Sequence, residues 1–313
     1  MKNKYLRKIP VVLIFGPTCT GKTSLAIKLA DGIGEIISAD STQVYKKLNI
    51  GANKPTKEEL KKIKHYLISF LGLNEQFNAG YFQKVASKLI VKIWSKKKIP
   101  FIVGGTGLYF SSLLYGLVDI PIIKNTIRER IKNLLSIKGN IRLYSILEKI
   151  DPDYAAKISV NDSQRIVRAL EVVFSTGTAF SSFHNKTNIY NQSFDFLKIG
   201  LSINRQELYN RINNRVDIML EKGLVFEVLQ LFKHGYNSNN AGMKGIGYRE
   251  FLNFFKGYYG FHETVNQIKQ NTRRYAKRQL TWFKTFENVN WFAPEQTDYI
   301  ENLFNQFIKK YGL

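Results

Sequence analysis

The chain has 313 residues, 44% hydrophobic and 23% charged, which is enough to build a buried core and excludes a disordered chain. Its 47 Lys and Arg against 24 Asp and Glu give a formal charge of +23, which favours a polyanionic partner, although a general drift toward lysine would give the same excess. The single cysteine, Cys19, excludes an internal disulfide and a cysteine-based zinc site, and no apolar run reaches membrane length, so we expect a soluble, cytoplasmic protein with no membrane partner.

The first third of the chain alternates strand and helix signals. The predicted elements are a strand at 11–15, a helix at 22–31, a strand at 35–38, a helix at 79–97 and a strand at 100–103. Strands that alternate with helices are typical of an α/β protein, in which helices cover both faces of a parallel sheet.

The pattern changes at about residue 119. Amphipathic helices are predicted at 122–135, 141–150 and 162–174, with no convincing strand among them. A strand at 196–203 and helical segments at 205–234 and 262–286 follow. We therefore predict an α/β core made of residues 1–118 and 196–313, interrupted by an all-helical insertion at 119–195.

A phosphate-binding motif follows the first predicted strand directly. The motif G-x-x-x-x-G-K-[ST] is matched in full by Gly16, Pro17, Thr18, Cys19, Thr20, Gly21, Lys22 and Thr23. Its glycines let backbone N–H groups surround phosphate oxygens, Lys22 neutralises the outer phosphate, and Thr23 can bind Mg²⁺. The motif predicts a P-loop NTPase-like sheet, a diphosphate or triphosphate ligand and Mg²⁺ as cofactor. An ordinary NTPase is disfavoured, because we find neither a clear Walker B strand nor a guanine-reading Asn-Lys-x-Asp motif.

Two further motifs follow the next predicted strands of the core. Asp40 lies in the segment SADSTQVY at 38–45, and Thr106 lies in the Gly-rich segment VGGTGLY at 103–109. Ligands bind at the carboxyl ends of parallel strands, so Asp40 can face the phosphate site and act as a general base. The alternative for Asp40 is a turn or helix-capping aspartate.

These three motifs, together with GANKP at 51–55, resemble the tRNA dimethylallyltransferase (isopentenyltransferase) family in order and spacing. The similarity continues at 161–171, 205–212, 245–250 and 272–283, and so covers nearly the whole chain. The resemblance implies transfer of the dimethylallyl group from dimethylallyl diphosphate to N6 of adenosine 37 in the tRNA anticodon loop, with release of diphosphate. It also implies a monomer, in which Asp40 is the base, Thr106 contacts the bridging oxygen, and Arg205 and Arg211 reach the diphosphate.

The RNA partner is expected on two helical segments. Residues 256–284 carry seven basic side chains and one acidic, Glu263, and a helix there would align Lys269, Arg273 and Lys277, with Ile268, Tyr275 and Trp282 on a core-facing stripe. The resemblance assigns 164–168 to contacts near the anticodon loop. The residues expected to contact tRNA are Asp40, Ser41, Thr42, Gln43, Thr106, Arg128, Gln164, Arg165, Ile166, Val167, Arg168, Arg273, Arg274, Lys277 and Arg278.

Three other functions remain open on the residues alone. A small-molecule P-loop kinase would share the phosphate motif and Asp40, but does not need the basic helix. A transferase that prenylates free adenine nucleotides would use the same chemistry, and a non-catalytic RNA-binding protein would not need Asp40 and Thr106 together. The sequence departs from the family pattern at Asn53, Tyr66, Ser69 and Tyr81. The resemblance therefore does not determine which residues line the prenyl pocket.

Overall fold

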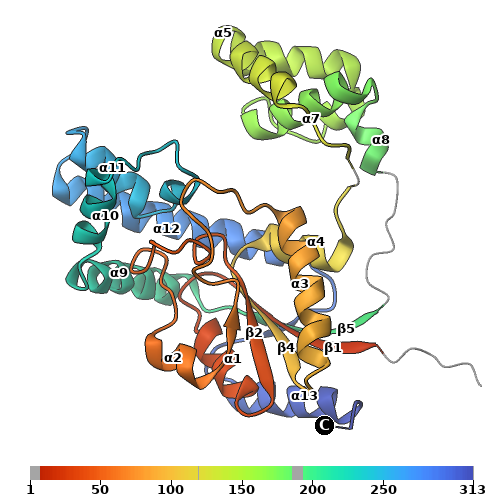
Figure 1. Ribbon diagram of the computed structural model, residues 1–313, viewed down its shortest axis with the longest axis vertical. Coiled ribbons are helices and arrows are strands. Elements are labelled where there is room, and N and C mark those ends of the chain that lie inside the picture. Colours follow the sequence, from red (N-terminus) through yellow and green to blue (C-terminus); the bar gives the residue numbers. More distant parts are fainter. Residues whose placement is uncertain (1–7, 119, 185–192, 313) are drawn as a thin grey trace, which may run out of the picture. The chain divides into compact units, whose positions relative to one another are not determined.

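The computed structural model describes residues 8–118, 120–184 and 193–312, which form two compact units (Figure 1). Unit 1 combines Met1–Leu114 with Asn191–Leu313, and unit 2 consists of Tyr115–Tyr190. The ends of the insertion were predicted at 119 and 195. Each unit has its own hydrophobic core, and each is described separately below.

The centre of unit 1 is a six-stranded sheet in the order β3-β2-β4-β1-β5-β6, in which every pair is parallel. The strands are β1 Ile9–Phe15, β2 Gly34–Ala39, β3 His65–Tyr66, β4 Ile99–Gly104, β5 Phe194–Leu201 and β6 Asn290–Phe292. The predicted parallel sheet of P-loop type is confirmed. The short strands β3 and β6 lie at the two edges and were not predicted.

Alternating side chains of β1 pack on opposite faces of this sheet, as strand geometry requires. Val12 and Ile14 join one core cluster with α1 (Lys22–Ala30) and α13 (Thr297–Lys309). Phe15 points the other way and contacts Phe110 of α4 (Gly107–Tyr115) and Phe283 of α12 (Phe261–Phe283). Helices therefore cover both faces, and α3 (Ala79–Trp94) also lies against the sheet.

Four helices beside the sheet form a second core in unit 1. They are α9 Arg205–Glu221, α10 Leu224–Lys233, α11 Tyr248–Phe255 and α12, which lie together in Figure 1. Residues 205–234 were predicted as one helical stretch. The structure breaks it at Gly223, which has a φ of 93°, a conformation that favours glycine.

Unit 2 consists of helices, and its described residues contain no strand. Its largest helix, α5 (Asn125–Ile150), bends at Gly139, which has a φ of 70° and separates the two helices predicted from the sequence. The core of the unit packs Leu143 and Leu147 of α5 against Leu170 of α7 (Ser163–Thr176). The shorter elements of the two units are α2 Lys57–Lys62, α6 Pro152–Ala155, α8 Phe180–His184 and η1 Ala241–Lys244. Within the described part of the chain, no helix is both long enough and apolar enough to span a bilayer.

Candidate active site

The three motifs meet where the central strands end. Gly104, the last residue of β4, lies in register with Phe15 of β1 on one side and Ala39 of β2 on the other. A Cβ at Gly104 would come within 2.2 Å of the Ala39 carbonyl oxygen, so this close approach of two backbones requires glycine. The P-loop (residues 16–23), Asp40 and Thr106 therefore leave the same edge of the sheet.

The P-loop is held in shape by its own side chains. Gly21 has a φ of 80° and caps the start of α1, and the Thr20 hydroxyl donates a hydrogen bond to the Pro17 carbonyl at 2.9 Å. The Lys22 ammonium donates to the same carbonyl at 2.5 Å. Burial, followed by the nearby positive charge of Arg215, lowers the pKa of Lys22 to about 8. An anion that enters the loop therefore stabilises the protonated form of Lys22.

A cavity of about 810 Å³ opens over the loop, entirely within unit 1. Its walls include Thr18, Cys19, Gly21, Lys22 and Thr23 of the P-loop, the segment 40–43 and the segment 103–105. The remaining walls come mainly from α9, α12 and the loops at 51–56 and 244–247. The predicted phosphate site and the predicted base thus line one continuous space.

Asp40 can serve both as a turn aspartate and as a general base, the two alternatives that the sequence left open. Its Oδ1 accepts hydrogen bonds from the Thr42 N–H at 2.8 Å, the Thr42 hydroxyl at 2.6 Å and the Gln43 N–H at 3.3 Å, which is the pattern of a turn aspartate. All three bonds end on one oxygen. Among the described residues no donor bonds to Oδ2, so that oxygen can accept a proton from a ligand in the cavity.

Thr106 lies beside this segment and is tied to it. Its Oγ1 accepts a hydrogen bond from the Ser41 N–H at 3.1 Å, and its own N–H donates to the Ala39 carbonyl at 3.1 Å. Tyr275 of α12 closes the same corner. Burial, followed by the negative charge of Asp40, raises the pKa of Tyr275 to about 12, so the phenol stays protonated at neutral pH. Tyr275 was predicted to lie on a core-facing stripe and was not among the predicted site residues.

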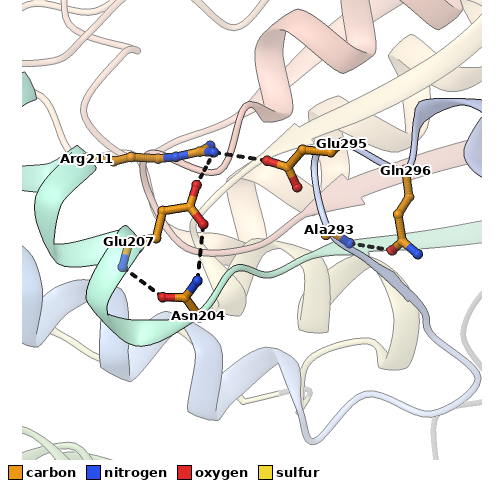
Figure 2. A network of polar contacts seen from close by, with 6 residues as sticks. All are labelled: Asn204, Glu207, Arg211, Ala293, Glu295 and Gln296. Carbon is orange, nitrogen blue, oxygen red and sulfur yellow. Dashed lines mark hydrogen bonds and ion pairs between the residues drawn. The ribbon is translucent and has the colours of Figure 1, made fainter.

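Arg211 lies at the cavity wall, but two carboxylates hold it (Figure 2). Its guanidinium pairs with Glu207, one turn earlier in α9, and with Glu295 at 3.0 Å. Asn204 caps α9 by accepting the Glu207 N–H at 2.9 Å, and its amide donates to the Glu207 carboxylate at 3.2 Å. The cap therefore fixes Glu207, and Glu207 in turn orients Arg211.

Arg215 is a basic residue of the cavity wall that was not predicted from the sequence. It lines the cavity one turn after Arg211, its charge lowers the pKa of Lys22, and its buried Nε has no partner among the described residues. Arg205, predicted to reach the diphosphate, is exposed and is not part of the cavity wall; its Nε donates to the Tyr209 hydroxyl at 3.2 Å. The i, i+4 spacing of Arg211 and Arg215 is the sequence signal from which the second arginine could have been predicted.

The basic residues of α12 divide into two groups. Lys269 pairs with Asp217 at 2.6 Å and Arg273 donates to Asn213 at 2.7 Å, so both are engaged with α9. Arg274, Lys277 and Arg278 are exposed, and Arg278 also lines the cavity. Trp282 was predicted to face the core, but it is 37% exposed. It packs on Gly107 instead, and its indole N–H donates to the Ser111 hydroxyl at 3.1 Å.

Unit 2 carries the remaining residues expected to contact tRNA. Gln164 and Arg165 are exposed near the start of α7, and Arg128 is exposed on α5. Arg165 and Arg168 pair with Asp162 and Glu171, at 3.2 Å and 3.3 Å. Val167 packs against the core of unit 2, and Ile166, at 0% exposure, lies within it.

The four departures from the family pattern have different surroundings. Asn53 lines the cavity, and its carbonyl accepts a hydrogen bond from the Gln43 amide at 3.1 Å. The Tyr66 hydroxyl donates to Glu35 at 2.8 Å, away from the cavity wall. Ser69 has a φ of 54° in a loop, and the exposed ring of Tyr81 packs edge-on against Phe77. Of the four, Asn53 alone belongs to the cavity wall in the described part of the chain.

The donor set suits Mg²⁺ only together with a phosphate ligand. Thr23 offers a hydroxyl oxygen at the cavity wall, and hard oxygen ligands are the ones that Mg²⁺ prefers. The described residues contain no group of three or more His, Cys, Asp or Glu that could hold a metal alone. Mg²⁺ in such sites keeps several waters and binds substrate phosphates, and the residues here fit that arrangement.

A parallel sheet whose central strand leads into a complete phosphate-binding loop, with Lys22 and Arg215 lining one cavity, defines a protein of the P-loop class. The model of the family described as IPP transferase matches residues 43–286, and the chain belongs to this family.

Similar proteins agree with this assignment over nearly the whole chain. The tRNA dimethylallyltransferase of Alkaliphilus oremlandii is 42% identical and that of Acetivibrio thermocellus 43%, covering 96% and 94% of both chains, respectively. The crystal structure of a tRNA delta(2)-isopentenylpyrophosphate transferase from Staphylococcus epidermidis, 38% identical, matches with a TM-score of 0.69 over 97% of this chain and 100% of that one. A eukaryotic dimethylallyltransferase acting on tRNA, 30% identical, matches with a TM-score of 0.80 over 95% of this chain and 77% of that one.

Proposed function

We propose that this chain transfers the dimethylallyl group of dimethylallyl diphosphate to N6 of adenosine 37 in the anticodon loop of tRNA and releases diphosphate. Its relatives are named as transferases of this kind. The observation that carries the proposal is the shared cavity, which is lined by a P-loop and by a carboxylate whose Oδ2 accepts no hydrogen bond from the described residues.

Asp40 is the proposed general base. The exocyclic amine of adenine is a poor nucleophile, because its lone pair is delocalised into the ring, and removal of its proton assists attack. The Asp40 Oδ2 would accept that proton as the new C–N bond forms, while the bonds to Oδ1 hold the carboxylate still. The segment 41–43 would then border the acceptor base.

The leaving group is the proposed ligand of the P-loop. As the allylic C–O bond breaks, negative charge builds on the bridging oxygen, and preorganised cations and donors stabilise it. Lys22 and Arg215 supply positive charge at the cavity wall, Arg211 lies at the same wall, and the Thr106 hydroxyl is the proposed contact to the bridging oxygen. Mg²⁺, held by Thr23 and the diphosphate, would neutralise part of the same charge.

The acceptor is proposed to be tRNA because of the basic surface. Arg274, Lys277 and Arg278 project from the helix that carries Tyr275 into the active site, so an RNA backbone along that helix lies next to the chemistry. A flipped loop base can then enter the cavity, and unstacking a loop base costs little. Neither a small-molecule kinase nor a transferase for free nucleotides needs this exposed basic row.

One assay separates these functions. The protein and Mg²⁺ are incubated with dimethylallyl diphosphate and either unmodified tRNA or AMP, and the nucleosides are analysed by mass spectrometry. Prenylation of tRNA at N6, without prenylation of AMP, supports the proposal. Prenylation of AMP alone, or ATP-dependent phosphorylation of a metabolite, would refute it. The monomeric state, the cytoplasmic location and the choice of five-carbon donor stay predictions from the resemblance and the sequence.

A further inference from the structure

We infer that Gln279 is a positioning residue: its side-chain amide holds the P-loop and the turn at 104–106 at a fixed separation. The inference rests on the proposed prenyl transfer, because it concerns the two segments that would hold the two ends of the breaking bond. Gln279 lies on α12, 261 positions from its partner Thr18 in the chain. It is 6% exposed.

The amide makes one hydrogen bond to each segment. Its Oε1 accepts the Thr18 N–H of the P-loop at 2.9 Å, and its Nε2 donates to the Gly105 carbonyl at 2.8 Å. Each partner is a backbone group with a fixed role, so the orientation of the amide is determined. A flipped amide would face N–H with NH₂ and C=O with an oxygen, and both bonds would be lost.

Gly105 leaves room for this contact. A Cβ built on Gly105 would lie 2.2 Å from the Gln279 Nε2, so any larger residue there would displace the amide. The glycine therefore serves the close approach of a side chain from α12 to the backbone of the turn. Thr106, the proposed contact to the bridging oxygen, is the next residue in the chain.

The two bonds thus span the place where the leaving group would lie. The P-loop would hold the diphosphate on one side, and Thr106 would meet its bridging oxygen on the other. A misplacement of about 1 Å between such groups can cost 10²-fold in rate, because transition-state contacts require close alignment. Loss of the amide should therefore lower kcat more than it raises the KM for either substrate.

The test compares two isosteric replacements of buried glutamines. Gln279→Met keeps the volume of the side chain and removes both backbone hydrogen bonds, together with the hydrogen bond to the Tyr275 side chain. Gln83→Met on α3 is the matched control, because Gln83 is 7% exposed, lies outside the cavity wall, and its Nε2 has no partner among the described residues. Gln279→Glu is a third variant, which can still accept the Thr18 N–H but cannot donate to Gly105.

For Gln279→Met we expect kcat to fall by roughly 10- to 100-fold, with each KM changed by less than about threefold. Gln83→Met should keep both constants. Gln279→Glu should lose at least as much kcat as Gln279→Met, because it places a negative charge against the Gly105 carbonyl. A wild-type kcat in Gln279→Met, or an equal loss in Gln83→Met, would overturn the inference.

Hydrogen exchange gives a readout that needs no activity. In wild-type protein the Thr18 amide is bonded to Gln279, so the P-loop peptide should exchange faster in Gln279→Met and at the wild-type rate in Gln83→Met. If wild-type protein fails to prenylate tRNA, the proposed function is refuted, and the exchange rates still decide whether the amide holds the loop. Unchanged exchange in Gln279→Met contradicts the inference on its own.

A double-mutant cycle tests the same contact from the Gly105 side, and Gly105→Ala alone serves if Gln279→Met fails to fold. Gly105→Ala should lower kcat in the wild-type background, where its Cβ displaces the amide. In the Gln279→Ala background the amide is gone, so the same change should cost at least about fivefold less. Additive losses would show that Gly105 and Gln279 act separately, and the inference would be wrong.

Discussion

Arg215→Met tests how the cavity recognises the leaving group. The change removes one positive charge and keeps most of the side-chain volume. Arg215 lines the cavity, and its buried Nε has no partner among the described residues, whereas the neighbouring Arg211 is already paired with Glu207 and Glu295. An incoming diphosphate therefore gains a new ionic partner at Arg215 and competes with two carboxylates at Arg211.

The magnitude follows from the type of contact. A hydrogen bond to a charged group contributes about 1.5 to 3 kcal/mol, which corresponds to a loss of roughly 10- to 150-fold in affinity for inorganic pyrophosphate. Arg211→Met should cost less, about fivefold or below, because Arg211 must give up a bond to Glu207 or Glu295 in order to bond to the diphosphate.

A second effect appears in the pH dependence. The protonated form of Lys22 binds the anion, so binding is strongest below pH 8 and declines by about tenfold per pH unit as Lys22 loses its proton above its pKa of about 8. Arg215 is one of the causes of this low pKa. Its removal should raise the pKa, and the decline should begin at higher pH. Lys22→Met should lack the decline.

Isothermal titration calorimetry with pyrophosphate and Mg²⁺, from pH 6.5 to 9.5, measures both effects. Protonation of pyrophosphate itself is common to all variants, so affinities are compared between variants at each pH. Two results would refute this account of the cavity: an Arg215→Met affinity equal to wild type with an unmoved pH midpoint, or a larger loss in Arg211→Met than in Arg215→Met.

Three further predictions concern the base, the metal and the RNA. Asp40→Asn keeps the Oδ1 acceptor of the turn and should lower kcat by roughly 10²- to 10⁴-fold with little change in tRNA affinity; wild-type turnover would exclude Asp40 as the base. Thr23→Ala should raise the Mg²⁺ concentration for half-maximal activity by roughly tenfold, and an unchanged Mg²⁺ titration would exclude Thr23 as a ligand. Lys277→Glu should weaken tRNA binding and lower the salt slope of log K by about one, in filter-binding assays. Lys88→Glu on α3 is the charge-matched control, and equal losses in both variants would argue for a nonspecific charge effect.

The sequence was sufficient for the parts of the site that are contiguous in the chain. The P-loop motif, the strand before it and the helix after it are encoded within 22 residues, Ile9 to Ala30, and the structure follows them. Asp40 and Thr106 could be brought to the same edge because both follow predicted parallel strands, and carboxyl ends of such strands meet. The predictions of a parallel sheet and of the family also rested on contiguous motifs, and both were confirmed.

The rest of the site depends on contacts between distant segments. Arg215 and Gln279 look like ordinary helix residues in the sequence, and only the packing of α9 and α12 against the sheet brings them to the P-loop. Periodicity placed Tyr275 on an inward stripe, but it does not distinguish a core from a cavity wall. It was wrong for Trp282, whose indole lies over Gly107, where the missing side chain leaves room at the surface.

The order of strands also sets the order in which the chain can fold during synthesis. β1 pairs with β4 on one side and with β5 on the other. Ile9 therefore cannot pair with Phe194 until about 185 further residues have been synthesised. Until β5 has left the ribosome, an apolar strand has one row of backbone N–H and C=O groups without a partner, which is a template for aggregation. Unit 2 is synthesised in this interval and has its own core, so it can fold while β1 still has an open edge. Nascent chains that stall within Tyr115–Tyr190 should therefore be the most dependent on chaperones.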